Sequence, residues 1–599
     1  MTNRKMIMII IKRTILFYFI GKKSLLSGFH ISLVFMLLLS FKSSGQNDGI
    51  VHDFNFTLPG ESGEQIEIFT DRTLYIVTEN IHFTVNYSVN RDLNSLNWSN
   101  VLYVELIRWN GEKMVQSKFT LNKTGVAGYL QIPGDIYSGY YYIRAYTRWM
   151  RNYSNSDYGY SLVKIVNPFK QEIDPGPDKN NDLQYDVPEK MQAEKMVKGI
   201  SCSTHKTVYR PREKVELNLL VDKEFSDNYH DYYISVVNAG CLDTSYLYPF
   251  SGAHESQTEG IKFLPEIRRA SVSGYVTEGN TGQPLAGVEI YLSVPVGGEY
   301  FSVFNSGEQG EFFFTLPYLT GNYDFFIEVL ADNSVEAKIR IDNDFCSVPV
   351  TLPYLLFELN AEEEKLVQKL MINRQLEEKF DFDSVEAAAK ETASQVVFYG
   401  SPQTVIHVGE YIELNDLEEF IFELVPQVIV YHKKGKPYVR MEHETGLSYL
   451  EPLVLIDNLP VSNIELFLKT PLKKLDRIEL INQEYIAGNK IFSGLVSIYS
   501  KDNDFAGFEM SKNSMFFNYN LYSDNTYNSP VYDGTSYRSR IPDRRNLLFW
   551  QPHVYLNSEE TTGFSFYTSD DKGDYIVYVR SINDKNTPGI YGTCLFTVE

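Results

Sequence analysis

The stretch PLVLIDNLPV, residues 452–461, has the features of a buried strand that ends in a sharp polar corner. Val454, Leu455 and Ile456 are consecutive apolar residues, a pattern typical of a strand that is covered on both faces. Asp457 and Asn458 follow directly, and both residue types favour tight turns. The stretch therefore predicts a strand and turn inside a small packed domain.

The residues around this stretch predict a mixed α+β domain over 401–512. Leu417, Phe420, Ile421 and Leu424 recur at helical spacing ahead of Pro426, which predicts a helix whose capping pair is Asn415 with Glu418. Short strands are predicted from the apolar runs at 427–431, 438–442, 453–457, 477–482 and 494–500.

Together with the run LDRIELINQEYIAGNKIFSGLVSIYSK (475–501), the opening stretch resembles the plug domain of TonB-dependent outer-membrane transporters. The residues that carry the resemblance are Pro452, Leu453, Val454, Leu455, Ile456, Asp457, Pro460 and Val461. Family members usually have a G-x-R-G-A-like turn, whereas this chain has GNKIFSG at 488–494, without the arginine. Residues 513–599 are too few for a surrounding barrel of about 22 strands. The resemblance therefore implies a plug-like domain that docks in trans against an outer-membrane β-barrel or another envelope protein.

The whole sequence is too long for one hydrophobic core and is rich in residues that suit β-sheets. It has 599 residues, 14% of them aromatic, and a net charge of −22. Tyr and Phe favour pleated, half-buried surfaces, so the fold class we expect is mainly β and multidomain, with tandem β-sandwiches beside the α+β domain. The acidic balance repels phosphate backbones and anionic lipid surfaces, so it excludes nucleic acid as a main partner.

The first predicted sandwich spans residues 64–168. Its opening, TDRTLYIVTENIHFTV (70–85), and its close, SGYYYIRAYTRWMRN (138–152), resemble the macroglobulin domain of the alpha-macroglobulin superfamily. The close is similar to a bacterial exported branch whose members often also carry a plug-like domain. Polar residues 169–199 predict a linker. The run KTVYRPREKVELNLLV (206–221) resembles a second macroglobulin-like sandwich, over 200–268.

Residues 271–350 resemble the carboxypeptidase regulatory-like fold, a small sandwich without a catalytic zinc site. The segments SGYVT (273–277), TGQPLAGVEIYL (281–292) and GEQGEFFFTLP (307–317) carry the resemblance. A helical connector follows at 355–400, with a helix from 361 to about 380 that is capped by Asn360 and Glu363. Residues 513–599 predict a C-terminal sandwich containing a hairpin between 564–567 and 575–579.

The N-terminus has the pattern of an export signal. Lys22 and Lys23 precede the short apolar run 31–41, and small residues lead up to Gln46, so cleavage after Gly45 is expected. A retained anchor is the alternative. After Gln46 no apolar stretch is long enough to predict a transmembrane helix. We therefore expect a signal peptide at 1–45 and a protein in the periplasm or at the outer membrane of a Gram-negative cell.

Four cysteines remain for an exported chain, which permits disulfides. Cys202 and Cys241 fall in one predicted domain and are a possible pair; four buried free thiols are the alternative. The segment NAGCLD (238–243) lacks the Glu-Gln pair of a macroglobulin thioester. Histidines at metal-site spacing, a nucleophile elbow and a phosphate-binding loop are also missing, so we expect no enzyme activity, no metal and no cofactor.

These features predict a non-enzymatic envelope protein that presents a plug-like domain to an outer-membrane partner. A macroglobulin-like protease decoy without a thioester is the alternative, with the 169–199 segment as its cleavable bait. An enzyme with an unrecognised site is a third option.

Overall fold

The computed structural model describes residues 63–89, 98–122, 125–177, 196–225, 231–243, 262–332, 334–380, 397–411, 414, 416–443, 446–523, 527–532, 540–556, 558–582 and 589–599. These residues form mainly β-structure in several separate sheets, which confirms the predicted fold class. The predicted signal peptide at 1–45 lies outside them. None of the helices they contain is both long enough and apolar enough to cross a membrane.

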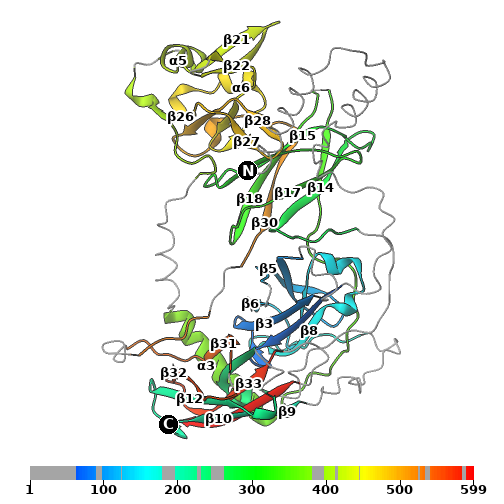
Figure 1. Ribbon diagram of the computed structural model, residues 1–599, viewed down its shortest axis with the longest axis vertical. Helices are drawn as coiled ribbons and strands as arrows, with labels where there is room; N and C mark the ends of the chain where they lie inside the picture. Colours follow the sequence, from blue (N-terminus) through cyan, green and yellow to red (C-terminus); the bar gives the residue numbers. More distant parts are fainter. Residues whose placement is uncertain are drawn as a thin grey trace, which may run out of the picture. The chain divides into compact units, whose positions relative to one another are not determined.

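The first sandwich pairs a three-stranded sheet with a five-stranded one (Figure 1). The small sheet contains, in order, β1 (Glu64–Thr70), β3 (Asn80–Val89) and β6 (Val126–Gln131). The large sheet contains, in order, β2 (Leu74–Ile76), β8 (Gly159–Val166), β7 (Gly139–Tyr146), β4 (Val101–Ile107) and β5 (Lys113–Thr120). Strands β4 and β8 are buried along their whole length.

The start of the predicted linker packs against this sandwich. Ile173 forms an isolated bridge with Ser138, and the backbone N–H of Asp174 donates to the Ser138 carbonyl at 2.8 Å. The Asp174 carboxylate pairs with Arg108. A linker over all of 169–199 is therefore wrong for 169–177, because Ile173 and Asp174 are bonded to the sandwich. Residues 178–195 lie outside the described part.

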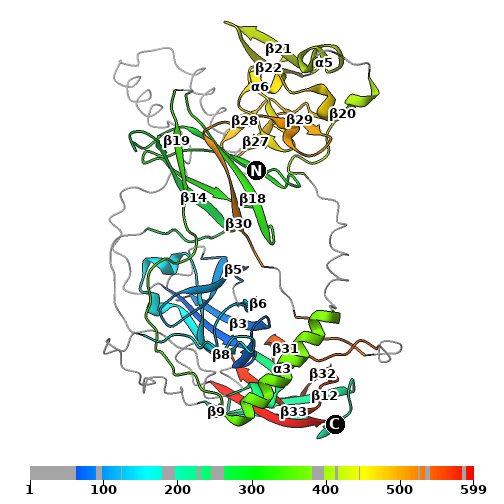
Figure 2. The ribbon, with the colours of Figure 1, turned by 180° about the vertical axis from the view of Figure 1, so that it is seen from behind.

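The sandwich predicted at 271–350, which we call the third sandwich, is completed by a strand from much later in the chain. One sheet has the order β17 (Glu311–Thr315), β14 (Ser271–Glu278), β19 (Ala337–Ile341). The other has the order β16 (Tyr300–Asn305), β15 (Glu289–Val294), β18 (Asn322–Leu330), β30 (Ser514–Asn520). Strand β30, orange in Figure 2, pairs antiparallel with the green β18 over seven residues. Residues 514–520 thus belong to this sandwich and not to the predicted C-terminal one.

Another sandwich is assembled from two distant parts of the sequence, and we call it the composite domain. Its smaller sheet has the order β10 (Ile200–Thr204), β12 (Lys214–Val221), β32 (Thr562–Tyr567). Its larger sheet has the order β11 (Val208–Tyr209), β34 (Ile590–Val598), β33 (Gly573–Ser581), β13 (Tyr232–Asn238), β31 (Leu547–Val554), and β9 (Val197–Lys198) also pairs with β34. Teal and red strands therefore share one domain in Figure 1.

The composite domain corrects three predictions. Segments 200–268 and 513–599 are not separate sandwiches, because strands from both share two sheets and one core. The hairpin between 564–567 and 575–579 is also wrong: β32 pairs with β12, whereas β33 pairs with β13 and β34. Near 266 the chain has left this domain, since Glu266 accepts a hydrogen bond from Tyr103 of the first sandwich at 2.7 Å.

The α+β domain has a five-stranded sheet, a three-stranded sheet and a hairpin. The first has the order β20 (Thr404–His407), β26 (Leu475–Ile481), β29 (Leu495–Ser500), β24 (Leu453–Ile456), β25 (Leu459–Pro460). The others are β21 (Val428–Lys433), β22 (Lys436–His443), β23 (Gly446–Leu447), and the pair β27 (Tyr485–Ala487) and β28 (Lys490–Phe492). Helices α5 (Leu417–Leu424) and α6 (Ile464–Leu468) cover its core. The helix prediction is confirmed, but its cap is Asp416, which accepts from Glu419 N at 2.8 Å.

Helix α3 (Ala361–Phe380) confirms the predicted helix and its cap. The Asn360 side chain accepts from Glu363 N, and the Glu363 side chain accepts from Asn360 N, both at 2.9 Å. The buried Val367 and Leu370 of α3 share a small core with Leu74 of the first sandwich and Cys241 of the composite domain. The helix therefore joins two sandwiches.

The first and third sandwiches share one continuous apolar core. Across this contact the Lys118 ammonium pairs with Asp344 at 2.6 Å, and both side chains are almost fully buried. A buried pair that lost one partner would leave an uncompensated charge, so this contact fixes the two sandwiches against each other.

Candidate functional sites

The predicted plug-like motif forms the centre of the α+β domain. All eight of its residues are buried: Pro452, Leu453, Val454, Leu455, Ile456, Asp457, Pro460 and Val461. Strand β24 lies between β29, which runs parallel to it, and β25. The motif is therefore core and turn, and any partner of this domain would contact other residues.

The polar corner of the motif connects the domain to its surroundings. Asp457 and Asn458 have φ of 47° and 63°, the left-handed values that a tight hairpin turn requires. The Asp457 carboxylate accepts from Ser500 N at 2.7 Å and from Phe505 N at 2.9 Å. The Asn458 amide donates to the Pro295 carbonyl of the third sandwich at 3.1 Å. One turn thus fastens β24 and also reaches the neighbouring domain.

The third sandwich and the α+β domain share an apolar core and several polar contacts. Tyr291, Phe301 and Val303 of the sandwich pack with Leu453 and Leu455 of β24. The Lys490 ammonium donates to Glu289 at 2.6 Å and to the Tyr291 hydroxyl at 2.9 Å. We call this contact the docking interface.

A small cavity at the docking interface is lined by an acid that has no cationic partner among the residues that the structure describes. Its volume is about 100 Å³, and Glu328, Ser462, Leu459 and Phe508 are among the residues that line it. Glu328 is 3% exposed and accepts one hydrogen bond, at 2.6 Å, from the Ser462 hydroxyl. Burial raises the pKa of Glu328 from 4.5 to about 7, and the Ser462 hydrogen bond only partly opposes this. Sequence reasoning missed this residue, because a lone Glu in a strand gives no local signal.

We expect Glu328→Gln to change the pH dependence of stability. The folded protein holds the Glu328 proton more tightly than the unfolded chain does. The contribution of Glu328 to the free energy of unfolding is therefore complete below pH 4.5 and is lost as the pH rises through about 7. The neutral amide removes this loss, which amounts to about 3 kcal/mol. Urea unfolding of both proteins between about pH 4.5 and pH 8 measures it. A stability difference between them that stays constant with pH would contradict the assignment.

A second cavity, about 710 Å³, lies where the first sandwich, the composite domain and the start of α3 meet. Thr73, Lys164, Gly240, Asp243 and Glu363 are among its lining residues. Lys164 pairs with Glu363 at 2.8 Å across it. A Cβ on Gly240 would lie 2.8 Å from the Leu366 side chain, so the glycine lets α3 approach closely. We call this cavity the junction cleft.

The cysteine beside the junction cleft lies in an environment that disfavours its thiolate form. Cys241 is fully buried, and burial raises the pKa of its thiol to about 12. A thiol with so little thiolate is a poor nucleophile. The predicted Cys202–Cys241 pair is wrong: Cys202 is bonded to Cys594, and Cys241 and Cys346 are free and buried. Cys202 and Cys594 face each other because β10 packs against β34. No local pattern in the sequence predicts this contact.

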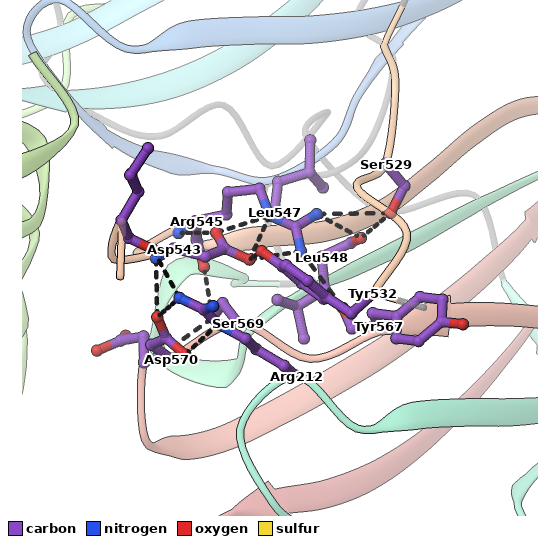
Figure 3. Close-up of polar contacts among 12 residues, drawn as sticks. Arg212, Ser529, Tyr532, Asp543, Arg545, Leu547, Leu548, Tyr567, Ser569 and Asp570 are labelled. Atoms are coloured by element: carbon purple, nitrogen blue, oxygen red, sulfur yellow. Dashed lines mark hydrogen bonds and ion pairs between the residues drawn. The ribbon is translucent and has the colours of Figure 1, made fainter. Parts of the chain in front are cut away.

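A polar cluster in the composite domain, drawn in Figure 3, joins four segments of the chain. Arg212 donates to both oxygens of Asp570, at 2.8 and 2.6 Å. Asp543 accepts from the Tyr532 hydroxyl at 2.7 Å and from Arg545 Nε at 2.9 Å. Burial opposes ionisation of Asp570, but the Arg212 hydrogen bonds and the Asp543 N–H outweigh it and lower the pKa of Asp570.

This cluster has the features of a structural clamp. Both acids are paired with guanidinium groups inside it, and Arg212 takes a left-handed φ of 58° to reach Asp570. The turn between β32 and β33 contains both Asp570 and Asp571. Asp571 is 2% exposed and pairs with Lys369 of α3 at 2.9 Å, so the turn is buried against that helix. Among the described residues, no group of three or more His, Cys, Asp or Glu is placed to hold a metal ion.

Comparisons with known proteins give only distant similarity. No protein-family model matches the sequence, and no curated protein matches it. Solved structures that match include Salmonella alpha-2-macroglobulin reacted with methylamine and E. coli alpha-2-macroglobulin in its native conformation, each with 9% identity and a TM-score of 0.21 over 92% of this chain. Trypsin-activated alpha-2-macroglobulin from Escherichia coli has 9% identity and a TM-score of 0.20 over 91%. This chain spans about two fifths of the length of these proteins (40–42%).

Proposed function

We propose that this protein is a non-enzymatic, exported envelope protein that holds its α+β domain in a fixed setting for an outer-membrane partner to bind in trans. The observation that carries the proposal is the docking interface. Buried apolar contacts, the Asn458 hydrogen bond and the Lys490 contacts all join the α+β domain to the third sandwich. A domain on a loose tether would need none of these contacts, whereas a presented domain needs a fixed orientation.

Two further observations support the proposal. The Cys202–Cys594 disulfide agrees with export, since disulfides persist in oxidising compartments such as the periplasm. The burial of Cys241 agrees with a protein that works by contact and forms no acyl bond. The protease-decoy alternative stays a prediction, because most of its proposed bait lies outside the described residues.

Site-specific photocrosslinking in intact cells tests this proposal. Tyr449 of the α+β domain is 93% exposed, and Tyr555 of the composite domain is 71% exposed. A photoreactive phenylalanine analogue at 449 is expected to give a discrete adduct with an outer-membrane protein, and the same analogue at 555 is the matched control. Equal adducts from both positions, or adducts only with proteins outside the envelope, would contradict the proposal.

A further inference from the structure

The hairpin formed by β21 and β22 has two different faces. Side chains alternate along each strand, and the inward face carries Val428, Val439 and Met441, all buried in the core of the α+β domain. The outward face carries Ile429, Tyr431 and Lys433 on β21 and Lys436, Tyr438 and Arg440 on β22. We call this set the basic hairpin face.

Positive charge is concentrated at the tip of this hairpin, where repulsion between like charges lowers the stability of the fold. Lys433 lies directly opposite Lys436, and like charges in that position repel. Between them Lys434 occupies the turn at a left-handed φ of 52°, where a long side chain is uncommon. All three lysines are exposed. Within the described residues, none of them lies in a salt bridge.

Aromatic rings continue the basic hairpin face away from its tip. Tyr431 and Tyr438 are stacked across the two strands with ring centroids 5.5 Å apart, and the Arg440 guanidinium lies 4.7 Å from the centre of the Tyr431 ring. The face therefore combines cations with amphipathic rings, the side chains that gather at the boundary between a membrane and water.

The nearby carboxylates offset only part of this charge. Glu465 pairs with Lys469 at 2.7 Å and also interacts electrostatically with Lys436. Glu418 lies 3.7 Å from His432, which belongs to the inward-facing register of the hairpin. Glu442 follows Arg440 on the outward face and is exposed. With Glu442 counted, the outward side of the two strands carries three cations and one acid, so its charge is positive in a chain whose net charge is −22.

We propose that the basic hairpin face docks on the phosphate-bearing headgroups of an anionic lipid membrane. Lysine and arginine near such a surface are attracted by its negative potential, and the two tyrosines fit the headgroup layer. The acidic remainder of the chain is repelled, so the same field that attracts the hairpin orients the molecule with this face toward the lipid. A long polyanion such as nucleic acid would also meet that acidic remainder, which disfavours it. The inference does not depend on the proposed protein partner.

Cosedimentation of the full chain with lipid vesicles tests this assignment. We expect binding to phosphatidylcholine vesicles that contain phosphatidylglycerol, weak binding to phosphatidylcholine alone, and loss of binding at high salt. The double variant K433E/K436E is expected to bind the anionic vesicles at least about tenfold more weakly, since each charge near the surface contributes to attachment. Both side chains are exposed, so the fold should persist, and K433Q/K436Q gives a milder second variant.

The double variant K338E/R340E is the matched control, because it makes the same charge change at two exposed residues of strand β19. It is expected to bind like the unmodified protein. Equal losses in both double variants would show a general charge effect and overturn the assignment. Unchanged vesicle binding by K433E/K436E would overturn the assignment as well. If this variant lost only the capture of an acidic envelope protein, the face would be a protein-binding site, and the assignment would also be overturned.

Discussion

Replacement of Arg144 by methionine is expected to cost about 3–5 kcal/mol in the free energy of unfolding. Arg144 and Glu105 lie on neighbouring strands of the first sandwich, with side chains 1% and 0% exposed. Arg144 Nε donates to Glu105 Oε2 at 2.8 Å. The methionine would leave the Glu105 carboxylate buried without its cation, which costs more than the pair itself contributes. Urea unfolding followed by tyrosine fluorescence measures the change.

Two variants control this result. In R144M/E105M both charges are replaced by apolar side chains, so we expect most of the lost stability to return. Lys469→Met breaks a pair whose side chains are 65% and 60% exposed, and no measurable change is expected. If R144M and K469M proved equally mild, the first sandwich would not depend on its buried pair.

Loss of the disulfide is expected to have the second large effect. Cys202 and Cys594 are 392 residues apart and join strands contributed by the two halves of the composite domain. Reduction, or C202S/C594S, should lower the stability of that domain by about 2–5 kcal/mol, because the unfolded chain is no longer constrained. Hydrogen exchange should rise first in the amides of β34, while those of β24 stay protected.

Treatment of both the unmodified protein and C202S/C594S with the reducing agent is the control. It should lower the unfolding temperature of the unmodified protein and leave that of C202S/C594S unchanged, since Cys241 and Cys346 are free in either case. Equal sensitivity of the two proteins to the reducing agent would show that another group is responsible.

Features that depend on neighbouring residues could be predicted from the sequence. The helix over 361–380 and its cap at Asn360 follow from spacing within about one turn. The strand around Val454 and the turn at Asp457 follow from an apolar run and from residues that accept left-handed φ. Such signals act within a few residues and survive in any tertiary setting.

The partners of distant strands could not be predicted in this way. The patterns of β12 and β32 are those of ordinary half-buried strands, yet they belong together although more than 300 residues lie between them. The hairpin prediction for 564–579 failed for the same reason: neighbouring strands were assumed to pair, whereas β32 pairs with the distant strand β12. The buried setting of Glu328 beside Ser462 and the Cys202–Cys594 bond likewise depend on contacts between segments that are far apart in the sequence.

By itself the sequence determined the mainly β class, the positions of several strands, the two longer helices and the acidic charge. Only the tertiary structure decided that the composite domain is built from two segments that precede and follow the third sandwich and the α+β domain in the sequence. The reason is physical: alternation of side chains fixes which face of a strand is buried, but the choice among many similar edges depends on packing between segments far apart in the chain.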